Sequence, residues 1–422
     1  MTKPSVVLNY RRILTFIIFG AAAIRFVIAP QTSIESRGDT LLFQLWGYSA
    51  STYGLTKVYE HPIEHPDYRI IALPNYLPPY LMTLHVLAQV HALFEPATAV
   101  GTPLSSIIFK TPAILFELAT ILLLAHIVRR RWGESWALGA AVLYAANPAM
   151  LFTTAAWGQV DAINTFFMVL CVWLLTQRKL TWAVVAFTAA FFIKLQSLAL
   201  APLLAYAIFH RWPYWRTLIR SLGAGLGTAF MLCLPFVLTG KTNQVFQVIA
   251  QAKDTNPVPS ANAFNLWWFF SGGYWTYRTD VASLFGMPMV LIGAGLFFSA
   301  VAFAVWFRSR AKATEGLWLA AAFLAFAFFM LPTQMHERYL FPFFALLIPA
   351  LPAFRPARWL YVALSCTFLW NLVVVFIILT QHEGTRLDNF WGGSLIVAML
   401  NVAIFAATVF WYTRMARRRA VT

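Results

Sequence analysis

The sequence predicts an all-α protein, a polytopic bundle of transmembrane helices with about twelve spans and with interfacial helices in the first external loop. Hydrophobic residues make up 60% of the 422 residues and charged residues only 11%, and the mean hydropathy is +0.68, well above that of a soluble domain. Most of the apolar stretches are long enough to cross a bilayer core of ~30 Å as helices. They lack the alternation of spanning β-strands. We therefore expect one integral-membrane domain over residues 1–422.

The apolar stretches set the order of the expected spans, which lie at residues 13–30, 104–128, 135–156, 160–176, 181–193, 195–209, 217–239, 283–307, 315–331, 338–353, 358–380 and 392–413. A further apolar stretch, residues 76–94, carries His85, Gln89 and His91. Counting it as a span would reverse the charge bias of the loops that follow. We therefore expect an interfacial or re-entrant helix there, and a further span is the alternative.

The formal net charge of +16 has a topological explanation. With the N-terminus inside, twenty Lys and Arg fall on the inner side of the expected spans and eight on the outer side. This bias follows the positive-inside rule, and it argues against a nucleic-acid partner. It predicts cytoplasmic termini, and the short basic inner loops are compatible with a bacterial plasma membrane.

The large hydrophilic segments and most acidic residues fall on the expected outer side. The two large hydrophilic segments, 31–103 and 240–282, are both external in this topology, and most of the acidic residues are external as well. No glycine-rich phosphate loop is present to bind a nucleotide on the inner side. We therefore expect these two external loops to form the active-site face.

Three cations, Arg25, Lys110 and Lys194, lie within or at the ends of expected spans and at one depth near the outer surface. A charge at the bilayer centre costs about 2.5 to 3.5 kcal/mol on insertion scales, so each cation needs a partner or a task. A shared anionic ligand, a phospholipid or a polyprenyl phosphate, would serve all three. In the alternative, they extend to headgroups or pair with Glu117, two turns from Lys110.

A second polar cluster opens an expected span at the outer surface. The stretch MHERYLFPF (335–343) places His336, Glu337 and Arg338 in a row. His336 and Arg338 can donate to phosphate oxygens, and free backbone N–H groups at a helix start also favour an anion. We therefore expect this stretch to contact the substrate.

Asp39 is the carboxylate best placed for catalysis. It heads a segment in which Leu42, Leu45, Trp46 and Ser49 follow helical spacing, so it should begin a helix on the membrane surface. A carboxylate there can act as general base on an incoming hydroxyl while a cation-held phosphate departs. In the alternative, Asp39 is a helix N-cap.

These stretches together resemble the GT-C superfamily of membrane glycosyltransferases, and most closely the bacterial mannosyltransferases related to the PIG-V type. The resemblance runs over residues 36–345 and rests on the ordered motifs GDTLLFQLWGYSASTYG, NYLPPYL, FKTPAILFELATILL, NPAMLFTTAAWGQVDAINTFFMVL, KLQSLALAPLL, NAFNLWWFF and MHERYLFPF. It implies a GT-C-like fold and an inverting transfer of a hexose, with mannose favoured. The donor would be a polyprenyl-phosphate sugar and the acceptor a lipid or glycan hydroxyl.

The resemblance also implies roles for residues of these motifs. The acidic residue taken as the catalytic base in such enzymes corresponds to Asp39. Donor recognition is implied for Trp157, Gln159, Asp161, Lys194 and Gln196.

From these roles we expect a pocket in which Gln159 and Asp161 bind sugar hydroxyls under the ring of Trp157. In the NAFNLWWFF motif, Trp267 and Trp268 would add another wall, and we expect Asn265 to bind substrate as well. An interfacial aromatic belt is the alternative for the tryptophans. The donor phosphate would lie on Lys194, Arg338 and Lys110.

One departure from the family pattern concerns metals. Relatives often carry an acidic residue before the Tyr-Pro-Pro stretch, but this chain has Asn75 in NYLPPY, with Asp67 eight residues earlier. We therefore predict no metal and no other cofactor, and we leave divalent-metal dependence open.

Two other functions remain possible from the sequence. One is a flippase or transporter of lipid-linked sugars, and the other is a ligase or polymerase that uses pyrophosphate-linked glycans. Transporters often contain matched broken helices in their two halves. Here the broken pair 181–209 has no counterpart in the second half, which disfavours transport.

Overall fold

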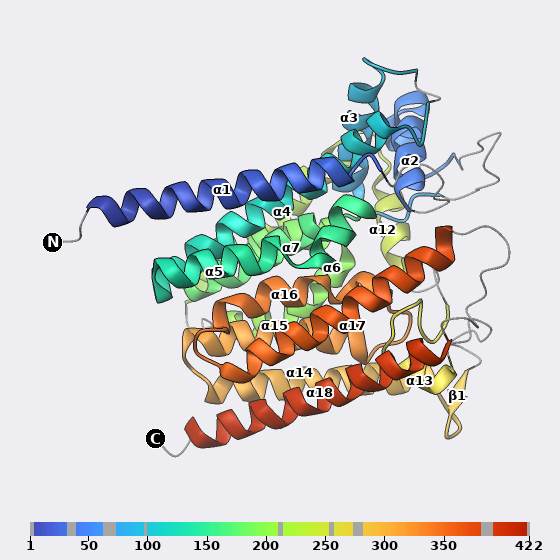
Figure 1. Ribbon diagram of the computed structural model, residues 1–422. Helices are drawn as coiled ribbons and strands as arrows, with labels where there is room; N and C mark the ends of the chain where they lie inside the picture. The colour runs from blue at the N-terminus through green and yellow to red at the C-terminus, as the bar shows by residue number, and fades with distance from the viewer. Residues whose placement is uncertain are drawn as a thin grey trace.

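The computed structural model describes residues 4–31, 39–61, 73–96, 99–209, 214–252, 257–272, 282–380 and 391–419. Within these ranges the chain is almost entirely helical (Figure 1). The described strands are β1 (Ser283–Leu284) and β2 (Met287–Pro288), which form one small antiparallel hairpin. The all-α prediction is therefore confirmed for the described part of the chain.

Most of the helices run side by side as a bundle (Figure 1). They are α1 (Pro4–Ile28), α4 (Pro103–Trp132), α5 (Glu134–Ala145), α7 (Asp161–Thr176), α8 (Leu180–Ile193), α9 (Ala201–Phe209), α10 (Trp215–Leu232), α14 (Met289–Arg310), α15 (Thr314–Met330), α16 (Phe341–Leu347), α17 (Arg355–Thr380) and α18 (Trp391–Arg419). Both termini lie at one end of the bundle, which we call the termini end.

The opposite end, which we call the site end, carries further helices (Figure 1). They include α2 (Asp39–Tyr53), α3 (Pro78–His91), α12 (Thr242–Gln251) and α13 (Leu266–Ser271). The remaining short turns of the bundle are α6 (Pro148–Leu151) and α11 (Leu234–Leu238). The two expected external loops thus contain helices, and part of each loop, including Asp67, lies outside the described residues.

Among the described residues, four helices are long and apolar enough to cross a membrane, namely α4, α14, α17 and α18. A fifth span results if α5 and the segment 148–156, bent by 48° from it, are counted as one. Shorter apolar helices include α7, α8, the segment 195–209 and α15. The chain is therefore an integral membrane protein. Each stretch expected to span contains helix, but twelve crossings are not confirmed.

The first external loop folds into a helical pair, α2 and α3, with its own small core of apolar side chains such as Leu41, Leu45, Leu81 and Leu84. Gly47 allows the two helices to approach, because a Cβ there would lie 2.6 Å from the carbonyl oxygen of Leu84. The helix α3 is not among the described helices suited to span. An interfacial position for residues 76–94 stays a prediction.

The centre of the bundle is formed by α15 and α16. Side chains all around α15, such as Phe323 and Phe326, are buried, and Phe343 and Phe344 of α16 are buried beside them. A helix that is apolar all round needs neighbours on every side. Here α14, α16 and α18 supply them.

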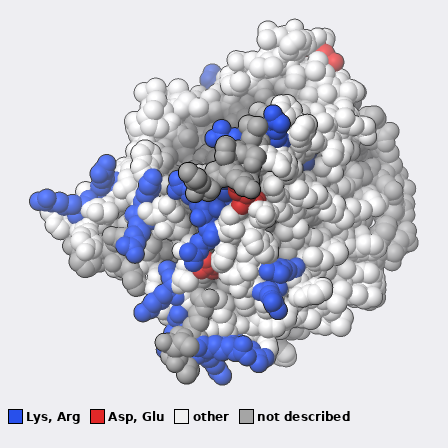
Figure 2. Space-filling model, turned by 60° about the vertical axis from the view of Figure 1, so that its left-hand side comes forward, with Lys and Arg blue, Asp and Glu red and all other residues white. Residues whose placement is uncertain are grey.

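Lysine and arginine gather toward the termini end, where few acidic residues accompany them (Figure 2). Arg129 pairs with Glu134, and Arg131 pairs with Glu315. This distribution agrees with the positive-inside pattern read from the sequence, and the cytoplasmic orientation of the termini stays a prediction.

Candidate active site

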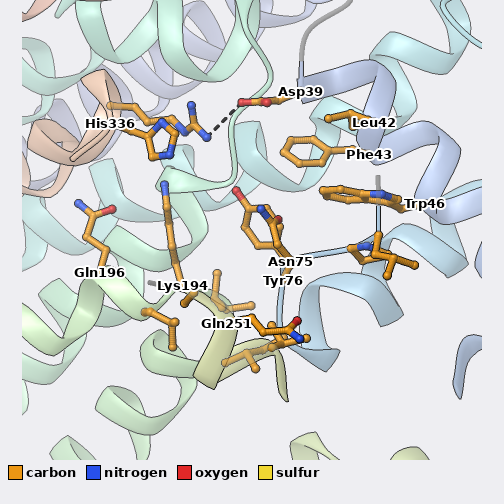
Figure 3. Close-up of a pocket in the computed structure, with 18 of the residues that line it drawn as sticks. Asp39, Leu42, Phe43, Trp46, Asn75, Tyr76, Lys194, Gln196, Gln251 and His336 are labelled. Carbon is orange, nitrogen blue, oxygen red and sulfur yellow. Dashed lines mark ion pairs between the residues drawn. The ribbon is translucent and has the colours of Figure 1, made fainter. Parts of the chain in front are cut away.

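A cavity of about 800 Å³ lies at the site end (Figure 3). Its walls come from α2, from the segment 73–77 before α3, from the break between α8 and residue 196, from α12, and from the segment 334–339. These segments are far apart in the sequence. The fold therefore brings the first external loop and the MHERY stretch to one hollow.

Asp39 is the first residue of α2 and lies at the edge of this cavity (Figure 3). Its carboxylate accepts a hydrogen bond of 2.8 Å from Nε2 of Gln159 and lies 3.1 Å from Nη2 of Arg338. The side chain stays 29% exposed. Asp39 is thus oriented by two partners and accessible to a ligand in the cavity.

Arg338 is the centre of the charged cluster. Besides Asp39, its Nη1 donates to Glu337 over 2.7 Å, and its Nε lies 3.9 Å from Oδ2 of Asp161. Burial raises the pKa of Glu337, while the Arg338 cation opposes that shift. A single guanidinium therefore joins three carboxylates from three segments.

His336 lines the same cavity (Figure 3). Burial, with the nearby cations Arg338 and Lys194, lowers the pKa of His336 well below its usual value. The imidazole is therefore neutral near pH 7 and can offer one N–H donor and one nitrogen acceptor.

Lys194 ends α8 and reaches into the cluster. Its Nζ donates to Oδ1 of Asp161 over 2.7 Å and lies 4.8 Å from the centre of the Tyr339 ring. Gln196, two residues later, donates from Nε2 to the carbonyl of Tyr339 over 2.6 Å. The break after α8 thus delivers a cation and an amide to the cavity wall.

Several buried polar atoms of this cluster have no hydrogen-bond partner. They are Oε1 of Gln159, Oδ2 of Asp161, Oε1 of Gln196 and Nε of Arg338. Buried polar atoms are normally paired, so each exception needs an explanation. Gln196 and Arg338 line the cavity, whereas Gln159 and Asp161 are fully buried and do not line it. They contact the lining residues Asp39 and Lys194 instead. The unpaired acceptors and the unpaired donor of this cluster are suited in type to the hydroxyls and oxygens of a sugar phosphate.

The AWGQVDA turn is held by its backbone. Gly158 has a φ of +79°, and a Cβ there would lie 2.8 Å from Cγ of Lys110 and 3.0 Å from Oγ1 of Thr40. Thr40 donates to the carbonyl of Trp157 over 2.5 Å. Glycine is therefore required both by its conformation and by space, and the turn is attached to α2 next to Asp39.

Lys110 supports this turn from behind. Its Nζ donates to the carbonyls of Ala29, over 2.9 Å, and of Ala156, over 2.8 Å. The sequence predicts Lys110 at the donor phosphate, but the structure does not bring Lys110 to the cavity. The reason is that a buried ammonium group needs hydrogen-bond acceptors for its N–H donors, and these two carbonyls supply them.

Arg25 is also engaged elsewhere. It is fully buried and forms two hydrogen bonds, of 2.7 and 2.5 Å, with the carboxylate of Glu117, to which Thr154 donates as well. The expected shared ligand for Arg25, Lys110 and Lys194 is therefore not what the structure shows. Of these three cations, Lys194 lines the cavity.

The predicted aromatic walls also lie elsewhere. Trp157 is 3% exposed and packs edge-on against Phe152 and Phe376 in the core. Trp267 donates from Nε1 to the carbonyl of Leu331 over 2.6 Å, and Asn265 caps α13 by accepting from the N–H groups of residues 267 and 268. The structure does not bring Trp157, Asn265 or Trp267 to the cavity. The Trp157 ring packs within the core, and the polar groups of Asn265 and Trp267 form hydrogen bonds within the bundle.

Other aromatic side chains line the cavity instead, namely Phe43, Trp46, Tyr76 and Tyr339. Two signals could have indicated them. Trp46 lies on the helix that Asp39 begins, and Tyr339 follows directly after Arg338. Tyr76 stands in the NYLPPYL motif, directly after Asn75.

Within the described ranges, no group of three or more His, Cys, Asp or Glu could hold a metal ion. Asn75, the departure from the family pattern, lines the cavity. Metal independence stays a prediction.

Residues 82–238 match the model of the dolichyl-phosphate-mannose-protein mannosyltransferase family. The matched stretch contains α3 from residue 82 onward, Lys110, the AWGQVDA turn and Lys194, and it excludes Asp39 and Arg338. The match confirms the resemblance to GT-C membrane glycosyltransferases. The finer likeness to the PIG-V type stays a prediction.

The chain is also similar to the crystal structure of ArnT from Cupriavidus metallidurans bound to undecaprenyl phosphate. The TM-score is 0.48 and the sequence identity 16%, over 99% of this chain and 79% of that chain. A likeness at this level is too weak to carry an argument about this protein. None of the curated proteins matches the chain.

Proposed function

We propose that this protein is a membrane glycosyltransferase that moves a hexose, with mannose favoured, from a polyprenyl-phosphate donor to a hydroxyl of a lipid or glycan acceptor, with inversion at the anomeric carbon. The reaction takes place on the outer face of what we propose is a bacterial plasma membrane. The observation that carries the proposal is the accessible carboxylate of Asp39, placed 3.1 Å from Arg338 at a cavity that Lys194 also lines.

The sugar of the donor lies against the unpaired acceptors of the cluster. Its hydroxyls donate to Oε1 of Gln159, Oδ2 of Asp161 and Oε1 of Gln196, which lack partners otherwise. An aromatic side chain such as Trp46 or Tyr76 is suited to contact the C–H face of a sugar ring. Buried atoms that are paired only by the ligand contribute strongly to selectivity for hydroxyl positions.

The phosphate of the donor lies between Lys194, His336 and Arg338. Both cations already have carboxylate partners, so the phosphate must compete for them. Competition at Arg338 weakens its ion pair with Asp39 while the guanidinium stays in place, and the carboxylate becomes better able to accept a proton. Donor binding would in this way activate the base.

The chemical step follows from this arrangement. Asp39 takes the proton of the acceptor hydroxyl, whose oxygen attacks C1 from the face opposite the phosphate. The bond from C1 to the phosphate oxygen breaks, and the phosphate leaves with the electron pair. Contacts from Lys194 and Arg338 that strengthen as this charge develops lower the barrier.

Sugar transfer by the detergent-purified protein tests the proposal, with a panel of labelled polyprenyl-phosphate sugars as donors and a membrane-lipid extract as acceptor. We expect transfer from one donor and a loss of about 10² to 10⁴-fold in turnover for Asp39→Asn. A matched control is Glu95→Gln, because Glu95 is a carboxylate of the same end that bonds His91 and Thr102 and does not line the cavity.

Three other results would count against the proposal. Wild-type turnover in Asp39→Asn would remove the base assignment. Labelled lipid that crosses between leaflets of proteoliposomes, without transfer from any donor, would make the protein a flippase. Transfer from pyrophosphate-linked glycans alone would make it a ligase or polymerase.

A further inference from the structure

A second cavity, of about 430 Å³, lies at the termini end, where α7 and α14 finish and α8 and α15 begin. Much of its wall is apolar and comes from Leu175, Leu180, Leu203 and Leu317. The last turn of α9 contributes Tyr206 and Ala207. The cavity is separate from the candidate active site and shares no lining residue with it.

Three cations line this cavity, namely Arg178, Arg308 and Lys312, and no Asp or Glu does. Within the described residues none of the three forms a salt bridge, whereas Arg129 and Arg131 at the same end pair with carboxylates. Arg308 donates from Nη1 to the carbonyl of Ala311 over 2.8 Å. The cavity thus combines positive charge with an apolar wall and has no acidic counterpart of its own.

The backbone at Arg178 adds a second observation. Arg178 follows the end of α7 with a φ of +57°, in the left-handed region. Glycine or asparagine is usual at this place after a helix, because a side chain makes the conformation less favourable. An arginine here directs a cation to the cavity at a conformational cost, as functional positions often do.

We propose that this cavity binds an anionic phospholipid of the leaflet at the termini end. Its phosphate lies among Arg178, Arg308 and Lys312, where guanidinium groups can form charge-assisted hydrogen bonds. The start of an acyl chain lies along the leucine wall. A free phosphate ion has no apolar part that could contact this wall. Basic pockets between transmembrane helices are suited to such headgroups. This proposal does not depend on the reaction at the other end.

Native mass spectrometry of the purified full chain tests this, with phosphatidylglycerol and phosphatidylcholine of identical chains as the probes. We expect wild-type protein to retain phosphatidylglycerol preferentially. Arg178→Gln, Arg308→Gln and Lys312→Gln combined should weaken that retention at least about tenfold. The matched control combines Arg216→Gln, Arg417→Gln and Arg418→Gln, which removes the same charge from exposed positions at the same end and should leave retention unchanged.

A separate variant keeps the charges and fills the space. Ala207→Trp should reduce retention as well, because the ring occupies the cavity, and its thermal unfolding in detergent shows whether the bundle is intact. If the cavity triple variant and the control triple variant lose phosphatidylglycerol to the same extent, the lipid is held by general attraction to positive charge, and the proposal is overturned. Full retention by Ala207→Trp, or displacement of the lipid by inorganic phosphate at equal concentration, would overturn it too.

Discussion

The two cavities, at opposite ends of the bundle, use their cations in opposite ways. At the site end, Lys194 and Arg338 are held by carboxylates within a largely buried cluster. At the termini end, Arg178, Arg308 and Lys312 line a cavity without any acidic residue. Two cavities that are both lined by cations can therefore be different kinds of site. In the first the charges are balanced and fixed in place, and in the second they still require an anion.

This difference bears on what each end can do. Charges fixed before the substrate arrives stabilise a transition state without reorganisation. Unbalanced charges at headgroup depth attract an anionic lipid but impose little geometry on it. Chemistry is therefore expected at the site end and lipid attachment at the termini end.

The largest expected effect on turnover comes from replacing one arginine by lysine at each end of the bundle. Arg338→Lys cannot maintain contacts with Asp39 and Glu337 together, because an ammonium lacks the planar fork of a guanidinium. We expect turnover in the transfer assay to fall about 100-fold or more, at the scale of a lost transition-state donor. Arg308→Lys at the other end should leave turnover unchanged. Similar turnover in the two variants would mean that Arg338 is only a counter-ion.

The next effect concerns stability. Glu117→Gln leaves the fully buried Arg25 without its counter-charge, so we expect a loss of about 3 to 5 kcal/mol. Glu315→Gln at the termini end removes the partner of Arg131, whose side chain is 59% exposed, and should cost about 1 kcal/mol or less. Thermal unfolding in detergent, followed by tryptophan fluorescence, measures both. Equal losses would show that the burial of Arg25 is not what makes its pairing important.

The fold class and the positions of the helical segments could be predicted from sequence because apolar length and charge bias are local signals. The helix that begins at Asp39 was visible in the spacing of Leu42, Leu45 and Trp46. The number of crossings could not be predicted in this way. Several apolar helices are shorter than a bilayer needs or are broken at polar positions such as Lys194.

The candidate site could be predicted only in part. Asp39, Gln159, Asp161 and Arg338 meet, and motifs had indicated each of them. The role of Lys110 could not be deduced, because its partners are backbone carbonyls that become neighbours only in the fold. The same holds for tryptophans whose N–H groups bond within the bundle. Residue type indicates chemistry, but the choice of partner is a tertiary property.

A smaller expected effect is the difference in stability between alanine variants of two glycines with positive φ, one at each end of the bundle. Gly158→Ala meets Lys110 and Thr40, whereas Gly133→Ala at the termini end has nothing within 4 Å. Both variants place a side chain at a positive φ, +79° at residue 158 and +87° at residue 133, which costs about 1 to 3 kcal/mol. Gly158→Ala adds an overpacking cost of about 1 to 3 kcal/mol. Thermal unfolding should therefore separate the two, and Gly158→Ala should also lower turnover because the turn holds Gln159 near Asp39. Identical unfolding would mean that Lys110 moves aside freely.

The smallest effect depends on pH and again distinguishes the site end. Burial beside Arg338 and Lys194 lowers the pKa of His336, so the folded protein binds this proton less readily than the unfolded chain. Stability from this group is present above the free imidazole pKa of about 6.5 and is lost as the pH falls below it. Between pH 7.5 and 5.5 the wild type should lose up to about 1.4 kcal/mol more than His336→Gln. His85→Gln, on α3 away from the cavity, is the control and should follow the wild type. If His336→Gln follows it as well, the imidazole is protonated at no cost, and the cluster at the site end is more open to water than the contacts of Arg338 indicate.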